Sequence, residues 1–186
     1  MWFDIVNRFT YEHIFAGEAE SLRELVEKAV RQGINLSEAN LMRADLEGAN
    51  LIKARLERAY LFGAKLSGAM LSYADLCDAK ISKADLSDAD LFKANLTSAN
   101  LHRACLVGAN LSEANLVRAD LIGANLSQAK IIGADLTGAF LTRADLTDAD
   151  LTDADLTRTE LLLAKGIAVQ LEELESYPQI TMASGV

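Results

Sequence analysis

Histidine and cysteine are the residue types that most often carry catalysis or hold a metal, and this chain has two of each. His13 stands near the amino terminus and His102 in the middle, and no third group is placed to orient either one. Cys77 and Cys105 are too few to make a disulfide framework, and no glycine-rich phosphate loop occurs. We therefore expect no enzyme activity, no metal site and no cofactor.

Aspartate is the other residue type with chemical potential, and it gathers toward one end of the chain. A candidate acidic patch consists of Asp135, Asp145, Asp148, Asp150, Asp153 and Asp155. Only Arg143 and Arg158 offset these charges. Carboxylates can hold calcium, but the glycine-rich nonapeptide of calcium-binding β-rolls is absent. The patch is instead compatible with a basic partner or with imitation of nucleic acid.

The formal net charge of the chain is -9. A phosphate field repels such a protein, so we expect no direct binding to nucleic acid or to anionic membranes. No apolar run approaches the roughly 20 residues of a membrane span. No basic segment followed by an apolar one opens the sequence, so we expect a cytoplasmic protein.

The elements that position these residues follow from a five-residue period. Every fifth position from 36 to 161 is Leu or Ile, which makes 26 positions, and an alanine precedes nearly every one by two residues. A period of five fits neither a helix nor a sustained strand. It does fit a chain that turns a corner every five residues, with Ala and Leu pointing to the same side of a short extended segment. Seven of the 11 glycines stand two residues after the Leu, where a turn needs backbone freedom.

Blocks such as Ala84-Asp85-Leu86-Ser87-Asp88 resemble the pentapeptide-repeat family, whose consensus A-(D/N)-L-x-x runs through residues 34–163. The resemblance implies an all-β solenoid, a right-handed quadrilateral β-helix with four repeats per coil and about 6.5 coils. Its core holds the Leu, Ile and Ala positions. Examples of the predicted core are Leu36, Leu41, Leu46, Leu51, Ile81, Leu96, Ile131 and Leu156.

Two terminal segments flank the repeats. Residues 1–33 are expected to form an N-terminal strand and helix cap, with a capping box at Ser21–Glu24 and Gly33 ending the helix. Residues 10–15 are expected to lie as a strand against the first coil. Residues 164–186 are expected to form a short helix around 169–176 and a flexible tail. This segment either seals the last coil or pairs two molecules, so the protein is a monomer or a dimer formed through its C-terminal end.

With four repeats per coil, outward residues recur every 20 positions and form columns. The candidate protein-binding face holds Met42, Tyr60, Phe62, His102, Ile122, Phe140 and Leu162. The opposite face holds Ile52, Met70, Tyr73, Phe92 and Ile132. Exposed apolar columns often mark interaction surfaces. The alternative is that the repeat tolerates any outward residue and that these apolar side chains are scattered neutral substitutions.

These patterns favour a non-catalytic scaffold of bacterial type that presents its side faces to a protein partner in a regulatory role. Some relatives in the family imitate DNA and bind the type II topoisomerase gyrase, which is the first alternative. Residues 36–163 carry 18 acidic and 13 basic side chains, and this weak excess argues against a DNA mimic. The second alternative is a purely structural spacer.

Overall fold

Each five-residue unit ends in a tight turn. The backbone N of each alanine donates a hydrogen bond to the carbonyl O of the leucine three residues before it, as in the 3.0 Å bond from Ala99 to Leu96. The residue two after each Leu or Ile has a φ between +55° and +67°, and a positive φ at this position is what a type II turn requires. Seven of these corner residues are glycines and 19 are not. The corner role predicted for the glycines is confirmed.

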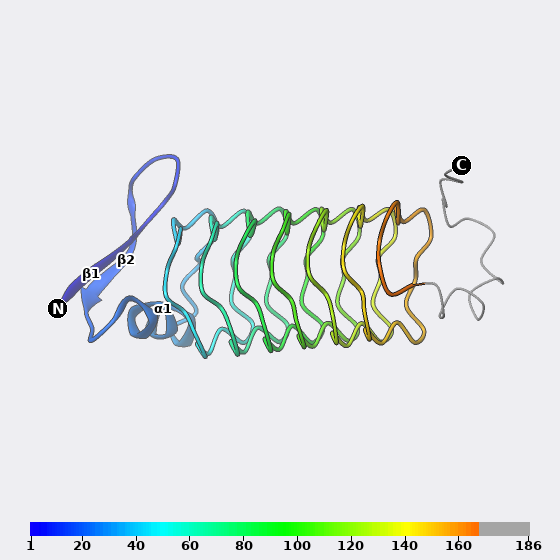
Figure 1. Ribbon diagram of the computed structural model, residues 1–186. Coiled ribbons are helices and arrows are strands. Elements are labelled where there is room, and N and C mark those ends of the chain that lie inside the picture. Colours follow the sequence, from blue (N-terminus) through cyan, green and yellow to red (C-terminus); the bar gives the residue numbers. More distant parts are fainter. Residues whose placement is uncertain (168–186) are drawn as a thin grey trace.

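The turns wind the chain into a four-sided coil. In this computed structural model, which describes residues 1–167, parallel bridges join residues 20 positions apart, from Asn40–Tyr60 to Asp145–Lys165. The backbone N of Leu96 donates to the carbonyl O of Asn115 at 2.7 Å, and equivalent bonds join the other coils. Twenty residues contain four five-residue units, so each coil has four sides. The quadrilateral β-helix is confirmed, and its coils stack into an elongated tower (Figure 1).

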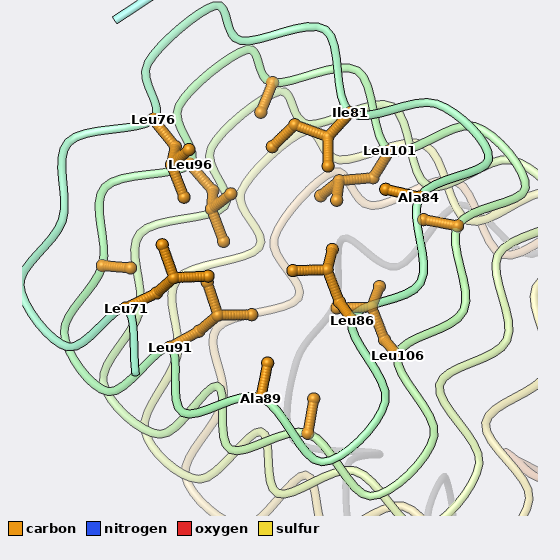
Figure 2. Packing of buried hydrophobic residues seen from close by; sticks show 14 of the residues in the cluster. Leu71, Leu76, Ile81, Ala84, Leu86, Ala89, Leu91, Leu96, Leu101 and Leu106 are labelled. Carbon is orange, nitrogen blue, oxygen red and sulfur yellow. The ribbon is translucent and has the colours of Figure 1, made fainter. Parts of the chain in front are cut away.

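Leucine and alanine fill the inside of the tower. Leu71, Leu76, Ile81 and Leu86 point toward the axis from the four sides of one coil, and the next four leucines lie directly against them (Figure 2). The core leucines and isoleucines of residues 36–161 are at most 6% exposed. Each such side chain contributes roughly 1.5–3 kcal/mol on burial. The inward alanines leave room for the leucines of the same coil.

A β-hairpin precedes the tower: strand β1, Trp2–Val6, pairs antiparallel with strand β2, His13–Glu18 (Figure 1). The structure differs here from the strand expected at residues 10–15. The side chain of Asn7 accepts hydrogen bonds from the backbone N of Phe9 and of Thr10, and this closes a loop between the strands. The part that lies against the first coil is instead the end of β1, where Asn40 N donates to Val6 O at 2.8 Å.

Helix α1, Leu22–Arg31, lies at the same end of the tower as the hairpin (Figure 1). Ser21 is its N-cap and accepts a hydrogen bond from Glu24 N, whereas the Glu24 carboxylate accepts from Glu20 N. Its buried stripe is Leu25, Val26 and Ala29, each 0% exposed and part of the same apolar cluster as the tower. The helix ends at Arg31, and Gly33 follows with a φ of +69°.

Departures from the repeat appear at the other end. Thr159 replaces alanine yet is fully buried, and its hydroxyl donates to the carbonyl O of Leu136 at 2.9 Å. Ile167, 5% exposed, joins the core cluster. The helix expected around 169–176 and the contact of a C-terminal dimer fall outside the described residues. Among residues 1–167, no helix has the length and apolar character to cross a membrane.

Candidate protein-binding faces

The four sides of the tower are named by their outward residues. Face 1 comprises 40–43, 60–63, 80–83, 100–103, 120–123, 140–143 and 160–163, and face 3, opposite to it, comprises 50–53, 70–73, 90–93, 110–113, 130–133 and 150–153. Face 2 comprises 45–48, 65–68, 85–88, 105–108, 125–128 and 145–148, and face 4 comprises 35–38, 55–58, 75–78, 95–98, 115–118, 135–138 and 155–158.

Face 1 holds all seven residues of the candidate protein-binding face: Met42, Tyr60, Phe62, His102, Ile122, Phe140 and Leu162. The backbone ladder sets their stacking, as in the 3.0 Å bond from Arg103 N to Ile122 O. Met42, Phe140 and Leu162 are exposed by 46%, 37% and 44%, and the other four are half-buried. The structure therefore places these residues in neighbouring columns that run along one side of the tower.

An aromatic cluster occupies the N-terminal part of face 1. The rings of Tyr60 and Phe62 stack with centroids 6.3 Å apart. The guanidinium of Arg8 lies 4.6 Å from the Tyr60 centroid and 4.5 Å from that of Phe9, and Lys83 Nζ lies 5.6 Å from the Phe62 centroid. Cations over ring faces are attracted by the ring quadrupole. The hairpin loop thus extends face 1, a contribution that the repeat pattern does not reveal.

Face 3 holds the second apolar set: Ile52, Met70, Tyr73, Phe92 and Ile132. Tyr73 and Phe92 pack edge to face with centroids 5.7 Å apart. Lys93 Nζ lies 5.1 Å from the Phe92 centroid and 3.1 Å from a carboxylate oxygen of Glu113. That hydrogen bond and the charge of Glu113 raise the pKa of Lys93. The central cation of face 3 is therefore paired within its own face.

The six residues of the candidate acidic patch do not share one face. Asp145 and Asp148 lie on face 2, Asp150 and Asp153 on face 3, and Asp135 and Asp155 on face 4. They encircle three sides of the last coils. Asp145, Asp150 and Asp155 each accept hydrogen bonds from the hydroxyl or backbone N of the threonine two residues later, and these bonds lower the pKa of each carboxyl group.

The histidines and cysteines lie on different parts of the molecule, with no two of them on the same face. His13 Nδ1 is 2.6 Å from a carboxylate oxygen of Asp4 on the exposed hairpin, while His102 is half-buried on face 1. Cys77 on face 4 and Cys105 on face 2 are both free thiols. Burial and then the charge of Asp78 raise the pKa of the Cys77 thiol. Within residues 1–167, no three His, Cys, Asp or Glu side chains are grouped to hold a metal ion.

Comparison with known proteins agrees with the repeat geometry. A family model for pentapeptide repeats matches eight copies, over residues 32–58, 59–97, 94–131 and 124–161. A search among curated proteins finds no match.

Several solved structures are similar to the chain. A pentapeptide repeat protein of the Arabidopsis thaliana thylakoid lumen is 28% identical with a TM-score of 0.53, covering 66% of this chain and 82% of that one. HetL, a protein involved in heterocyst differentiation regulation in the cyanobacterium Nostoc sp., is 32% identical with a TM-score of 0.43, covering 71% of this chain and 80% of that one. Trypsin-treated QnrB1, a plasmid-mediated fluoroquinolone resistance protein, is 21% identical with a TM-score of 0.39, covering 73% and 84%.

Proposed function

The chain belongs to the pentapeptide-repeat family, and from that premise we propose that it is a non-catalytic scaffold that binds a protein partner through face 1. The observation that carries the proposal is the recurrence of apolar side chains on this one face, at both ends and on either side of the polar rungs 80–83 and 100–103. Apolar side chains recur along it from Met42 at the first coil to Leu162 at the last, and Phe9 and Arg8 of the hairpin extend it.

A folding role does not account for these side chains. The buried core is complete without them, since the inward Leu and Ala positions are already shielded from water. Large apolar groups in a line on an outer surface are typical of contact with another molecule. Aromatic residues such as Tyr60 and Phe62 are enriched in protein interfaces.

The alternative function is imitation of DNA toward a type II topoisomerase. Duplex DNA is negative on all sides. In this tower the aspartates encircle only three sides of the last coils, and face 1 carries Arg43, Lys83, Arg103 and Arg143. The charge distribution therefore favours the scaffold. A gyrase supercoiling assay separates the two functions, because a DNA mimic inhibits or protects gyrase at micromolar concentration and the scaffold leaves it unchanged.

Affinity capture from the native cell followed by mass spectrometry tests the scaffold. The wild type, Phe62→Lys and Ile122→Lys are used as baits, and Val117→Lys is the matched control. Val117 occupies the same half-buried position of its repeat as Ile122, one corner away on face 4. We expect one or more partners that the wild type and Val117→Lys retain and that both face 1 variants lose. Identical partner lists from all four baits would instead favour a rigid spacer.

A further inference from the structure

The charges of the tower are divided unevenly among its faces. Face 1 carries five basic residues, Arg43, Lys80, Lys83, Arg103 and Arg143, against two acidic ones, Asp120 and Glu160. The other three faces together carry eight basic and 16 acidic residues between positions 36 and 163. Face 1 is therefore net positive by three charges on a protein whose formal net charge is -9.

The cations of face 1 are available to a partner. Each of the other faces pairs a cation with one of its own carboxylates: Lys65 with Asp45, Lys93 with Glu113, and Arg58 with Glu38. Within residues 1–167, by contrast, the five basic side chains of face 1 form no ion pair. An unpaired positive strip in a negative protein concentrates an electrostatic attraction for anions on that one side.

Four of these cations form one column at the turn position beside the apolar residues: Arg43, Lys83, Arg103 and Arg143. The intervening rungs are Gly63 and Gly123, and the stems of Arg43 and Arg103 extend over them. Arg43 Cγ is 3.6 Å, and Arg103 Cγ 3.5 Å, from where a Cβ on the respective glycine would lie. These distances place the two basic stems along the face, over the glycine rungs.

We propose that face 1 binds an extended acidic segment of a partner protein, with carboxylates on the basic column and apolar side chains against Met42, Phe62, Ile122 and Leu162 of the neighbouring column. This inference rests on the proposed scaffold function and names the chemistry of the partner. Six intervals of about 4.8 Å make the face roughly 29 Å long, which is the length of about nine residues of extended chain. Cations recur every one or two rungs, about 5–10 Å, and this range includes the roughly 6.7 Å between successive side chains on the same side of a strand.

A protein segment fits this face better than other anions. Duplex DNA and anionic bilayers extend beyond one side of the tower and meet the negative charge of faces 2 and 4. They also offer no row of apolar groups at the spacing of Phe62, Ile122 and Leu162. A narrow strand contacts both columns of face 1 and remains clear of the neighbouring faces.

The test measures binding of a fluorescently labelled peptide of about nine residues that alternates glutamate and leucine, by anisotropy at low salt. A peptide with glutamine in place of glutamate is the uncharged control. The full chain is compared with the double variant Lys83→Glu, Arg103→Glu. The matched control is Lys53→Glu, Arg118→Glu, which makes the same charge change at the same turn position on faces 3 and 4, and in which Arg118 likewise extends over a glycine, Gly138.

We expect the acidic peptide to bind the wild type at least tenfold more tightly than the glutamine peptide. Its affinity is expected to fall as the salt concentration is raised. The face 1 double variant is expected to lose about tenfold in affinity and the control less than twofold. Equal losses in the two double variants, equal binding of the two peptides, or no binding at about 1 mM peptide would each overturn the proposal. So would tighter binding of short duplex DNA or of phosphatidylserine vesicles that the face 1 variant abolishes.

Affinity capture distinguishes this inference from the scaffold function itself. If the Ile122→Lys variant loses a partner that the Lys83→Glu, Arg103→Glu variant retains, the scaffold function is supported and the proposal of an acidic segment is wrong. Partners retained by both variants would remove both proposals.

Discussion

The guanidinium of Arg8 lies 4.6 Å from the centre of the Tyr60 ring, and this contact joins the N-terminal hairpin to face 1. Backbone bonds flank it, since Arg8 N donates to Glu38 O at 2.9 Å and Asn40 N donates to Val6 O at 2.8 Å. The backbone bonds hold the hairpin against the first coil, and the cation over the ring sets where its loop meets the face.

Arg8→Ala is expected to loosen the hairpin without unfolding the tower. A cation over an aromatic ring contributes about 0.5–1 kcal/mol at an exposed site. Hydrogen exchange should therefore quicken several-fold in residues 2–18 while the melting temperature of the tower stays unchanged. A double-mutant cycle with Tyr60→Leu should give a coupling energy of the same size. A coupling energy of zero would mean that the two side chains are merely adjacent.

Leu96→Lys is expected to unfold the middle coils, because Leu96 is 0% exposed and an ammonium group there has no partner in the apolar core. The expected loss exceeds about 4 kcal/mol. Lys93→Ala removes an exposed ion pair and a ring contact and should cost no more than about 1 kcal/mol. Circular dichroism melting compares the two, and equal melting temperatures would contradict the inward direction of the leucines.

Most of the tower was predictable from the sequence because a single periodic rule governs it. The burial of Leu96 follows from its place in the repeat, and four-fold stacking puts Phe62 and Ile122 in one column. The position of the hairpin strand was predicted wrongly because contacts outside the repeat determine it. The Asn7 side chain closes the loop, and the guanidinium of Arg8 lies over the Tyr60 ring. The positive sign of face 1 is invisible in a charge summed over the whole tower, and it emerges only when charges are assigned to separate faces.

Acid is expected to destabilise the last coils first. The pKa of Asp145, of Asp150 and of Asp155 is lowered by hydrogen bonds from Thr147, Thr152 and Thr157. A carboxyl group whose pKa is lower in the folded state contributes stability above its unfolded pKa, about 3.9, and loses that contribution as the pH falls through the folded value. Hydrogen exchange or melting measured between neutral pH and pH of about 3 should show this loss.

The triple variant Thr147→Val, Thr152→Val, Thr157→Val tests the cause of the acid sensitivity. It removes the hydroxyl donors, so its stability should depend less steeply on pH over the same range. Thr142→Val is the control, because Thr142 follows Phe140-Leu141 and has no aspartate two residues before it. An unchanged pH dependence in the triple variant would show that other carboxylates dominate.

Backbone strain is concentrated at the corners of the coils. Nineteen non-glycine residues in the tower adopt positive φ, and Gln128, with a φ of +60°, is an exposed example. A side chain in the left-handed region costs roughly 1–2 kcal/mol. The coil tolerates this cost because the turn positions the backbone for the ladder, where Gln128 N donates to Thr147 O at 2.9 Å.

Gln128→Gly is therefore expected to stabilise the tower. Glycine relieves the left-handed strain but adds freedom to the unfolded chain, so the net gain should be about 0.5–1 kcal/mol. Ser127→Gly, one residue earlier, should destabilise the tower, because that position has no positive φ and its hydroxyl donates to the Asn125 side chain at 2.8 Å. Urea unfolding midpoints measure both changes. A shift of both midpoints in the same direction would contradict the conclusion that positive φ limits the choice of residue at the corners.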